Sequence, residues 1–386
     1  MAIQFIDLRA QQQRILAAVQ ENISRVLAHG QYIMGPEIKE LEQRLAGYTG
    51  ARHAVSCSSG TDALLMALMA YGVGPGDAIF TSPFTFVATA EVISLLGATP
   101  VFVDIEPDTF NIDPTLLEKA VIALENKDPE IHPLPQGFEG LRPRGIIPVD
   151  LFGQPADYDR INALAAKKGL FVIEDAAQSF GAEYKRKNAC ALADAAATSF
   201  FPAKPLGCYG DGGMVFTDDD TLYEKMTSVR VHGKGSDKYD NIRIGINGRC
   251  DTLQAAILLA KFEIFPEEMN MRQDVANRYT DLLNDNPYIQ TPLVREGSLS
   301  AWAQYSLVSG KKDEILGALK KEGIPTAIYY PRPLHLQGAY AYLGHKPGDY
   351  PVSEDKAGKI FSLPMHPYLT EAEQRQITDV ILGAAR

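Results

Sequence analysis

Short apolar runs alternate with amphipathic helical segments over the first two-thirds of this chain, and this alternation constrains its fold more than any other feature. Strand patterns occur at residues 53–57, 77–82, 99–105, 145–152 and 170–174. Helical patterns lie before and between them, at residues 36–49, 61–71, 88–96 and 156–168. Because the later strands are almost continuously apolar, they belong in a mainly parallel sheet that helices cover on both faces. The sequence therefore predicts an α/β fold, a three-layer sandwich, with ligands bound beyond the carboxyl ends of the strands.

The chain of 386 residues is long enough for two domains. From about residue 262 the pattern changes, and a long helical segment over residues 266–284 leads into a smaller α/β unit. We expect a large domain over residues 1–261 and a smaller C-terminal α/β domain over residues 262–386. Residues 125–144 contain four prolines and no clear periodicity, which predicts an irregular surface insertion.

Lys204 lies in the most informative stretch of the sequence, between Ser199 and the glycine-rich segment 207–213. A hydroxyl before the lysine suits phosphate binding, and glycines after it let the backbone pass close to a flat ligand. Upstream of this stretch, an apolar strand ends in Asp175. An imine-forming amine together with a carboxylate for a ring nitrogen is the combination that pyridoxal phosphate (PLP) needs.

A second turn of small residues, Ser59-Gly60-Thr61, falls between a predicted strand and a predicted helix. Free backbone amides at a helix start bind phosphate without a cation, so Gly60 and Thr61 are candidate phosphate ligands together with Ser199. The glycines at 207, 210 and 212 also resemble a dinucleotide-binding loop. No buried strand leads into them at the required distance, and this disfavours the dinucleotide alternative.

Composition disfavours several other classes of function. The formal net charge of −11 argues against a nucleic-acid partner or a membrane surface. No apolar run approaches the length of a membrane helix, and the N-terminus lacks a basic-then-apolar signal. The four cysteines are scattered without Cys-x-x-Cys spacing, which predicts reduced thiols in a cytoplasmic protein and no metal site.

Several motifs in a fixed order make the chain similar to a known family. Beside the Asp175 and Lys204 segments, they are Phe5-Ile6-Asp7-Leu8, Gly30-Gln31-Tyr32-Ile33-Met34-Gly35-Pro36, Ser59-Gly60-Thr61-Asp62-Ala63-Leu64, Asn247-Gly248-Arg249-Cys250-Asp251 and Leu363-Pro364-Met365-His366-Pro367. They extend over nearly the whole chain and resemble the nucleotide-sugar aminotransferases of the DegT/StrS group, which are fold-type-I PLP enzymes. The resemblance implies that fold, PLP as cofactor and a transamination reaction.

The resemblance also implies roles for individual residues. Lys204 is expected to bind PLP covalently and, once released, to shuttle a proton, because a desolvated lysine has a lowered pKa. Asp175 would pair with the pyridine nitrogen, and Phe86 would stack on the pyridine face. The other implied cofactor contacts are Gly60, Thr61, Gln178, Ser199 and Asn247. Asn247 matches a family residue that reaches the cofactor phosphate of the neighbouring subunit, which implies a homodimer with shared active sites.

The implied substrate is a keto sugar carried on a nucleotide, with glutamate as the amino donor. Members that act at C4 often have a His where this chain has Phe201. The segment 199–213 instead resembles members that aminate C3 of UDP-2-acetamido-2-deoxy-3-keto-glucuronic acid for O-antigen assembly. Arg249 would then bind the uronate carboxylate. Tyr330 would line the sugar pocket, although the preceding Tyr329 replaces a His that is common in the family.

Three alternatives stay open beside this reading. The first is an aminotransferase for an uncharged 3-keto-6-deoxy sugar on dTDP. The second is a non-catalytic relative that binds a sugar nucleotide without converting it, which the joint presence of Lys204, Asp175 and Ser199 disfavours. The third is a sugar dehydratase of the same group, which Lys204 disfavours because those relatives carry histidine at that position.

Overall fold

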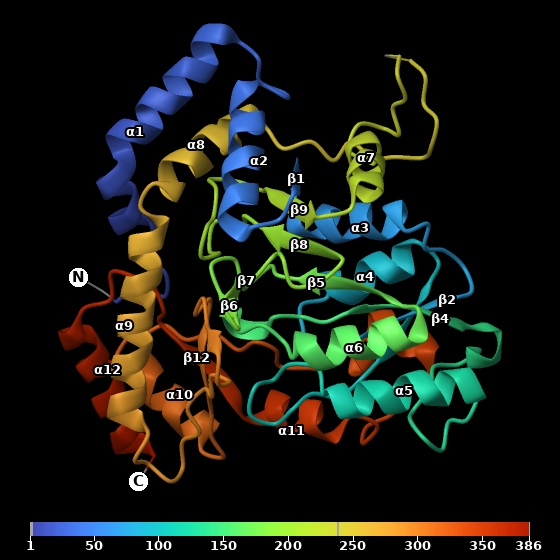
Figure 1. Cartoon of the computed structure of the whole chain (residues 1–386). Coiled ribbons are helices and arrows are strands. Elements are labelled where there is room, and N and C mark those ends of the chain that lie inside the picture. The colour runs from blue at the N-terminus through green and yellow to red at the C-terminus, as the bar shows by residue number, and fades with distance from the viewer. Residues whose placement is uncertain (1–2, 238, 386) are drawn as a thin grey trace.

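A seven-stranded sheet lies at the centre of the molecule. The computed structural model describes residues 3–237 and 239–385 (Figure 1). In spatial order the strands are β1 (His53–Cys57), β9 (Gly213–Thr217), β8 (Ala195–Ser199), β5 (Phe171–Asp175), β4 (Arg142–Ile147), β2 (Asp77–Thr81) and β3 (Thr99–Phe102). Strand β9 pairs antiparallel with both neighbours, whereas every pairing from β8 to β3 is parallel. The predicted α/β fold with a mainly parallel sheet is confirmed.

Helices cover both faces of this sheet, as predicted. One layer contains α3 (Gly60–Ala70), α4 (Ala88–Leu95) and α7 (Asp220–Val229), and the other contains α2 (Pro36–Thr49), α5 (Pro114–Asn126) and α6 (Tyr158–Lys168). Alternate residues of one strand enter the two cores: Ile173 packs with the α3 layer and Val172 with the α5 and α6 layer. The strands read as continuous apolar runs because both of their faces are buried.

Helix α1 (Leu8–His29) is an element that the sequence analysis did not predict. Its N-cap Asp7 accepts a hydrogen bond from the Ala10 amide, and Gly30 ends the helix in the left-handed conformation. The helix packs against α8 (Thr252–Phe262), which continues into α9 (Phe265–Leu283) along one edge of the molecule (Figure 1). Among the described residues no helix is long and apolar enough to cross a membrane.

The C-terminal part of the chain has a core of its own. It is built from α10 (Lys312–Lys321), α12 (Glu371–Ala384), β11 (Tyr305–Val308) and β12 (Ile360–Leu363), with α11 (Pro351–Lys359) beside them. Helix α9 joins this core to the larger one, because Phe265 packs in the large core and Tyr279 in the C-terminal core. The domain division into residues 1–261 and 262–386 stays a prediction.

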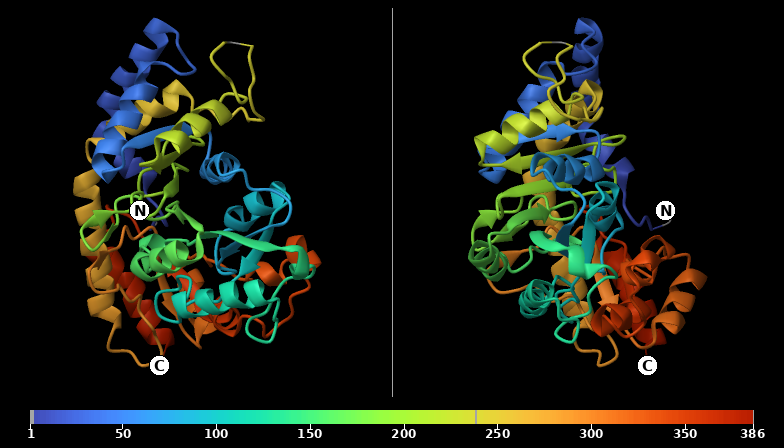
Figure 2. Two further views of the ribbon diagram at one scale, coloured as in Figure 1. Left: turned by 45° about the vertical axis from the view of Figure 1, so that its right-hand side comes forward. Right: turned by 90° about the vertical axis from the view of Figure 1, so that its right-hand side faces the viewer.

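A small three-stranded sheet, β10-β6-β7, lies outside the central one. Its strands are β6 (Glu183–Tyr184), β7 (Lys187–Asn188) and β10 (Ser298–Leu299). The segment between α7 and α8 extends away from the sheet in both views of Figure 2. These parts of the chain were not assigned from the sequence.

Two predicted boundaries around residue 145 are wrong. The expected irregular insertion 125–144 loses its ends to regular structure, since α5 runs to Asn126 and β4 begins at Arg142. The strand expected over residues 145–152 ends at Ile147, and residues 151–153 form a 3-10 turn instead. Pro143 obscured the strand start, and it is tolerated there because the ladder with β2 has a bulge next to it. The rest of the insertion packs on the C-terminal part through the Gln136 amide, which donates to the Leu343 carbonyl.

Candidate active site

Three segments that are distant in sequence meet at one edge of the sheet. Cys57 at the end of β1 and Ser199 at the end of β8 both pair with Gly213 of β9. This register places the Ser59-Gly60-Thr61 turn against Ser199. A Cβ atom on Gly60 would lie 2.7 Å from the Cβ of Ser199, and one on Gly213 would lie 2.3 Å from the Ser59 carbonyl oxygen. Only glycine permits such close approach at both positions.

The first turn of α3 offers donors for an anion. Ser59 caps the helix by accepting a hydrogen bond from the Asp62 amide at 3.0 Å. The hydroxyls of Ser58 and Ser59 also donate to the carboxylate of Asp62, the acidic residue of this turn. These bonds occupy the Asp62 side chain. The amides of Gly60 and Thr61 have no hydrogen-bond acceptor within the described chain. With the Ser199 hydroxyl beside them, they form a cradle that fits a phosphate group.

Asp175, the last residue of β5, is a buried carboxylate with two hydrogen-bond donors. Its Oδ2 accepts from the Thr89 hydroxyl at 2.8 Å, and its Oδ1 accepts from the Ala177 amide at 3.2 Å. Burial raises the pKa of Asp175, and these two hydrogen bonds and the charge of Lys204 oppose that rise. The two hydrogen bonds and the nearby lysine are thus the influences that favour the ionised carboxylate.

Lys204 lies close enough to Asp175 for each charge to affect the other residue's pKa. The protein atoms around Lys204 disfavour its ammonium and lower its pKa to about 8, while the Asp175 charge acts in the opposite direction. The residue still keeps some solvent-accessible surface, which a reacting amine needs. A lysine with this pKa exists partly as the neutral amine near neutral pH, in agreement with the expected role as nucleophile and proton carrier.

Gln178, Tyr330 and Phe86 lie around the end of β5. The Gln178 side chain accepts from the Phe152 amide at 2.7 Å and donates to the Tyr330 hydroxyl at 3.2 Å. The Tyr330 ring centroid lies 6.4 Å from that of Phe86, whose side chain is 56% exposed. Burial raises the pKa of the Tyr330 phenol, so this group stays protonated. The exposed Phe86 ring is thus available for stacking on a flat ligand.

Asn247 and Arg249 form a pair near the α3 turn. Both Nε and Nη2 of Arg249 donate to Asn247 Oδ1, at 2.9 and 2.6 Å. The Gly248 carbonyl between them accepts from the Ser58 amide at 3.1 Å, so the backbone between the two residues lies next to the turn before α3. Arg249 shares no hydrogen bond or ion pair with Lys204, Asp175 or Gln178, all of which the structure describes. Its predicted carboxylate contact stays a prediction.

The structure thus places the predicted residues in two adjoining groups. The cradle consists of Gly60, Thr61 and Ser199, and the backbone between Asn247 and Arg249 bonds to the turn before it. The second group, around the end of β5, consists of Phe86, Asp175, Gln178, Lys204 and Tyr330. The sequence analysis missed Thr89, the hydrogen-bond donor to Asp175. Thr89 lies one helical turn after Phe86, and this spacing was the only sequence feature that linked it to the site. Its contact with Asp175 depends on the tertiary fold.

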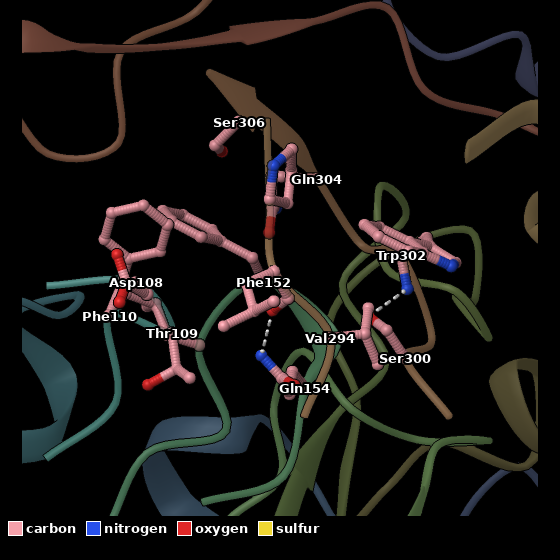
Figure 3. Close-up of a pocket in the computed structure, with 13 residues that line it drawn as sticks. Asp108, Thr109, Phe110, Phe152, Gln154, Val294, Ser300, Trp302, Gln304 and Ser306 are labelled. Atoms are coloured by element: carbon pink, nitrogen blue, oxygen red, sulfur yellow. Dashed lines mark hydrogen bonds between the residues drawn. The ribbon is translucent and has the colours of Figure 1, made fainter. Parts of the chain in front are cut away.

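A separate pocket is lined by Phe152 but not by Lys204. Figure 3 shows Asp108, Thr109 and Phe110 on one side of it and Trp302 on the other. Its internal volume of about 20 Å³ has room for little more than one water molecule. The buried Gln304 Oε1, which has no hydrogen-bond partner in the described chain, lies among the lining residues. This pocket is too small for a nucleotide sugar.

Comparisons with known proteins agree with this site. The model of the DegT/DnrJ/EryC1/StrS aminotransferase family matches residues 13–382. The UDP-2-acetamido-2-deoxy-3-oxo-D-glucuronate aminotransferase of Pseudomonas aeruginosa is 50% identical, over 96% of this chain and 97% of its own. The crystal structure of a DegT/DnrJ/EryC1/StrS aminotransferase from Brucella abortus is also 50% identical, covers 99% of both chains and has a TM-score of 0.93.

A third relative bears on the cofactor. A protein of Streptococcus pneumoniae, described as a sugar aminotransferase and solved in its PLP form, is 27% identical with a TM-score of 0.86 over 96% of each chain. The cradle, the buried carboxylate and the lysine of this chain fit that cofactor. The predicted fold, the aminotransferase activity and PLP as the cofactor are confirmed. With a family match over nearly its whole length, the chain belongs to the DegT/DnrJ/EryC1/StrS aminotransferase family.

Proposed function

We propose that this enzyme moves an amino group from glutamate to the 3-keto carbon of UDP-2-acetamido-2-deoxy-3-keto-glucuronic acid. The observation that carries the chemistry is the pairing of buried Asp175 with Lys204 beside a phosphate cradle. The choice of sugar is supported by the 50% identity to the Pseudomonas aeruginosa enzyme that is named for this substrate. O-antigen assembly is the use that we infer for the product.

Each residue has a definite task in this proposal. Bound PLP supplies an electron sink for the carbon that loses or gains a proton. Lys204 in its neutral form takes that proton and returns it, and its lowered pKa makes the neutral form available. Asp175 would pair with the pyridine nitrogen of the bound cofactor and favour its protonated form, and Phe86 would stack on the ring. The amides of Gly60 and Thr61 and the Ser199 hydroxyl bind the phosphate.

Arg249 is the proposed ligand of the sugar carboxylate. The net charge of −11 repels an anionic substrate, so a local cation has to compensate. Arg249 is only partly buried, and its nitrogens now contact a neutral amide oxygen of Asn247. Exchange of that neutral acceptor for a carboxylate gives a stronger, charge-assisted pair.

The test compares Arg249→Lys with wild type on two substrates, the 3-keto uronate and a 3-keto-6-deoxy sugar on the same nucleotide. A hydrogen bond to a charged group contributes roughly 1.5–3 kcal/mol, so kcat/KM for the uronate should fall by about one to two powers of ten. The deoxy sugar should lose much less, because it has no carboxylate. Arg25→Lys on the exposed surface of α1 is the matched control and should leave both values unchanged.

Equal losses on both substrates would remove the support for the uronate and favour the dTDP-linked 3-keto-6-deoxy sugar as the alternative. No turnover of any keto sugar nucleotide by the PLP-loaded protein would favour the non-catalytic alternative. Omitting glutamate from the assay, and replacing it with other amino acids in turn, tests the proposed donor.

A homodimer with shared active sites is part of the proposal. Tyr32, Ile33 and Met34 are 49%, 46% and 41% exposed, which is unusual for three consecutive large apolar residues. Ile33 bridges to Asp251, so this patch lies next to the segment of Asn247 and Arg249. A second copy of the chain that covers the patch would bring Asn247 near a neighbouring cradle.

We place the enzyme in the cytoplasm. All four cysteines are buried free thiols, as is usual for proteins of a reducing compartment. Fractionation of cells that express the tagged protein from its native locus tests this location.

A further inference from the structure

Thr89 connects two predicted parts of the cofactor site. Its hydroxyl lies 2.8 Å from Asp175 Oδ2 and 3.3 Å from the carbonyl oxygen of Phe86, one helical turn earlier. It also lies 3.2 Å from the Thr85 hydroxyl. Thr85 and Thr89 are 2% and 1% exposed, so water does not compete for these contacts. One buried side chain therefore contacts both the carboxylate and the backbone of the aromatic residue.

The direction of these hydrogen bonds follows from proton counting. The Thr89 hydroxyl has a single proton, and an ionised carboxylate at 2.8 Å is a stronger and closer acceptor than a carbonyl at 3.3 Å. Thr89 therefore donates to Asp175. The Thr85 hydroxyl then donates to the free lone pair of Thr89, which strengthens the donation of Thr89. The two threonines form a short directed chain that ends on the carboxylate.

We propose that Thr89, supported by Thr85, is a positioning residue that keeps Asp175 ionised and aimed at the pyridine nitrogen of the cofactor. This inference rests on the proposed function, in which Asp175 holds the pyridine proton. Without the hydroxyl, Oδ2 would keep no donor from the described protein, and the buried carboxyl would favour its neutral form. A neutral carboxyl no longer stabilises a protonated ring.

The charged and titratable groups that face Asp175 do not replace this donor. Lys204 favours its ionised form by charge alone. Tyr330 and Tyr158 are near enough for their pKa values to respond to Asp175, but their own pKa values are raised, so both are neutral. Burial also raises the pKa values of Glu174, the preceding residue of β5, and of Asp150, and neither side chain donates a hydrogen bond to the Asp175 carboxylate. Thr89 is thus the uncharged side chain that donates to the Asp175 carboxylate, and a substitution can remove its hydroxyl without changing any charge.

The experiment measures binding of pyridoxamine phosphate to the apoenzyme as a function of pH. This probe has the ring and the phosphate but makes no covalent bond to Lys204, so its Kd reports the contact with Asp175. Thr89→Val removes the hydroxyl with little change in volume, and Thr89→Ser keeps it. Thr85→Val tests the second threonine, and Asp175→Asn tests the carboxylate itself. Inorganic phosphate is the control ligand for the cradle.

We expect Thr89→Val to weaken binding about tenfold or more at neutral pH, as for loss of a hydrogen bond to a charged group. The acid limb of the pH profile should move to higher pH by about one unit, because one unit corresponds to one power of ten. Thr89→Ser should restore most of the affinity and the wild-type limb, and Thr85→Val should show a smaller shift. Phosphate affinity should stay unchanged in all variants.

The outcomes separate this inference from the proposed function. If Asp175→Asn binds pyridoxamine phosphate as tightly as wild type, the proposed role of Asp175 fails. If Asp175→Asn weakens binding but Thr89→Val does not, only the role of Thr89 is overturned. A uniform loss of affinity for Thr89→Val at every pH, without a shift of the acid limb, would also overturn it, because a merely structural defect gives that result.

Discussion

At the scale of single residues, the proposed function depends on two ionisable groups, Asp175 and Lys204, whose pKa values the protein moves toward each other. Burial raises the pKa of Asp175 and lowers that of Lys204, while the opposite charge of each residue limits the shift of the other. Buried titratable groups with specific partners concentrate at functional sites. The environment of this pair therefore indicates a functional site more strongly than its residue types do.

A first prediction concerns the pH dependence of Lys204. The rate at which PLP attaches to the apoenzyme should rise as the pH passes about 8, because only the neutral amine is a nucleophile. The Asp175 charge raises the lysine pKa, so Asp175→Asn should move the midpoint of the rise to lower pH. Near-visible absorbance follows the attachment, and borohydride with mass spectrometry locates it. A reduced adduct on another lysine, or a midpoint near the ordinary lysine value, would contradict this assignment.

At the scale of elements, the site depends on how closely β8, β9 and the start of α3 approach one another. The contacts of Gly60 and Gly213 with their neighbours require the absence of a Cβ atom. The expected phosphate ligands at the start of α3 are mainly backbone amides. A side-chain substitution cannot remove a backbone amide. The glycines are the accessible way to perturb them.

The second prediction uses Gly60→Ala. The new Cβ would meet the Ser199 Cβ at 2.7 Å, so the α3 turn or β8 must shift. Overpacking of this kind costs about 1–3 kcal/mol of folding free energy, and we expect PLP affinity to fall at least tenfold. Gly47→Ala in the last turn of α2 is the control, because nothing lies within 4 Å of its Cβ position. That variant should gain up to about 1 kcal/mol from helix propensity. Denaturant unfolding and PLP titration measure both quantities, and unchanged PLP affinity in Gly60→Ala would refute the cradle.

At the scale of the whole molecule, the proposed site lies at one edge of the large sheet, and an exposed apolar patch is formed by residues 32–34. The patch adjoins the segment of Asn247 through the bridge between Ile33 and Asp251. The segment that links α7 to α8 contains Ile242 and Ile244, which are 57% and 86% exposed. Apolar residues at such exposure favour an additional subunit over contact with water.

The third prediction is complementation between two inactive variants. Lys204→Ala and Asn247→Ala should each lose activity, and mixing them should restore one intact site per heterodimer if Asn247 acts across the interface. Each activity is measured before and after subunit exchange, which two different affinity tags verify. No recovery after verified exchange, or an active monomer in sedimentation experiments, would count against shared sites. Ile33→Asp should favour the monomer and lower activity together with dimer content.

The sequence by itself determined the chain's local structure and its chemical groups. Strand β1 and helices α2, α4 and α9 lie within one or two residues of their predicted bounds, because buried faces impose a regular apolar spacing. Asp175, Lys204 and the small-residue turn at 59–61 could also be found from the sequence, because each is marked by its immediate neighbours in the chain. The apolar spacing was a weaker guide at Pro143, a proline inside strand β4, and helix α1 was not predicted from it.

Only the tertiary structure decided which groups meet. Gly213 brings Ser199 to Gly60 through the register of two strand pairs, and Thr89 reaches Asp175 across 86 residues of chain. The bonds of Gln178 to Phe152 and Tyr330 likewise join distant segments. Such contacts leave no local periodicity, because their free energy comes from the packing of separate elements and not from the spacing of neighbours along one of them.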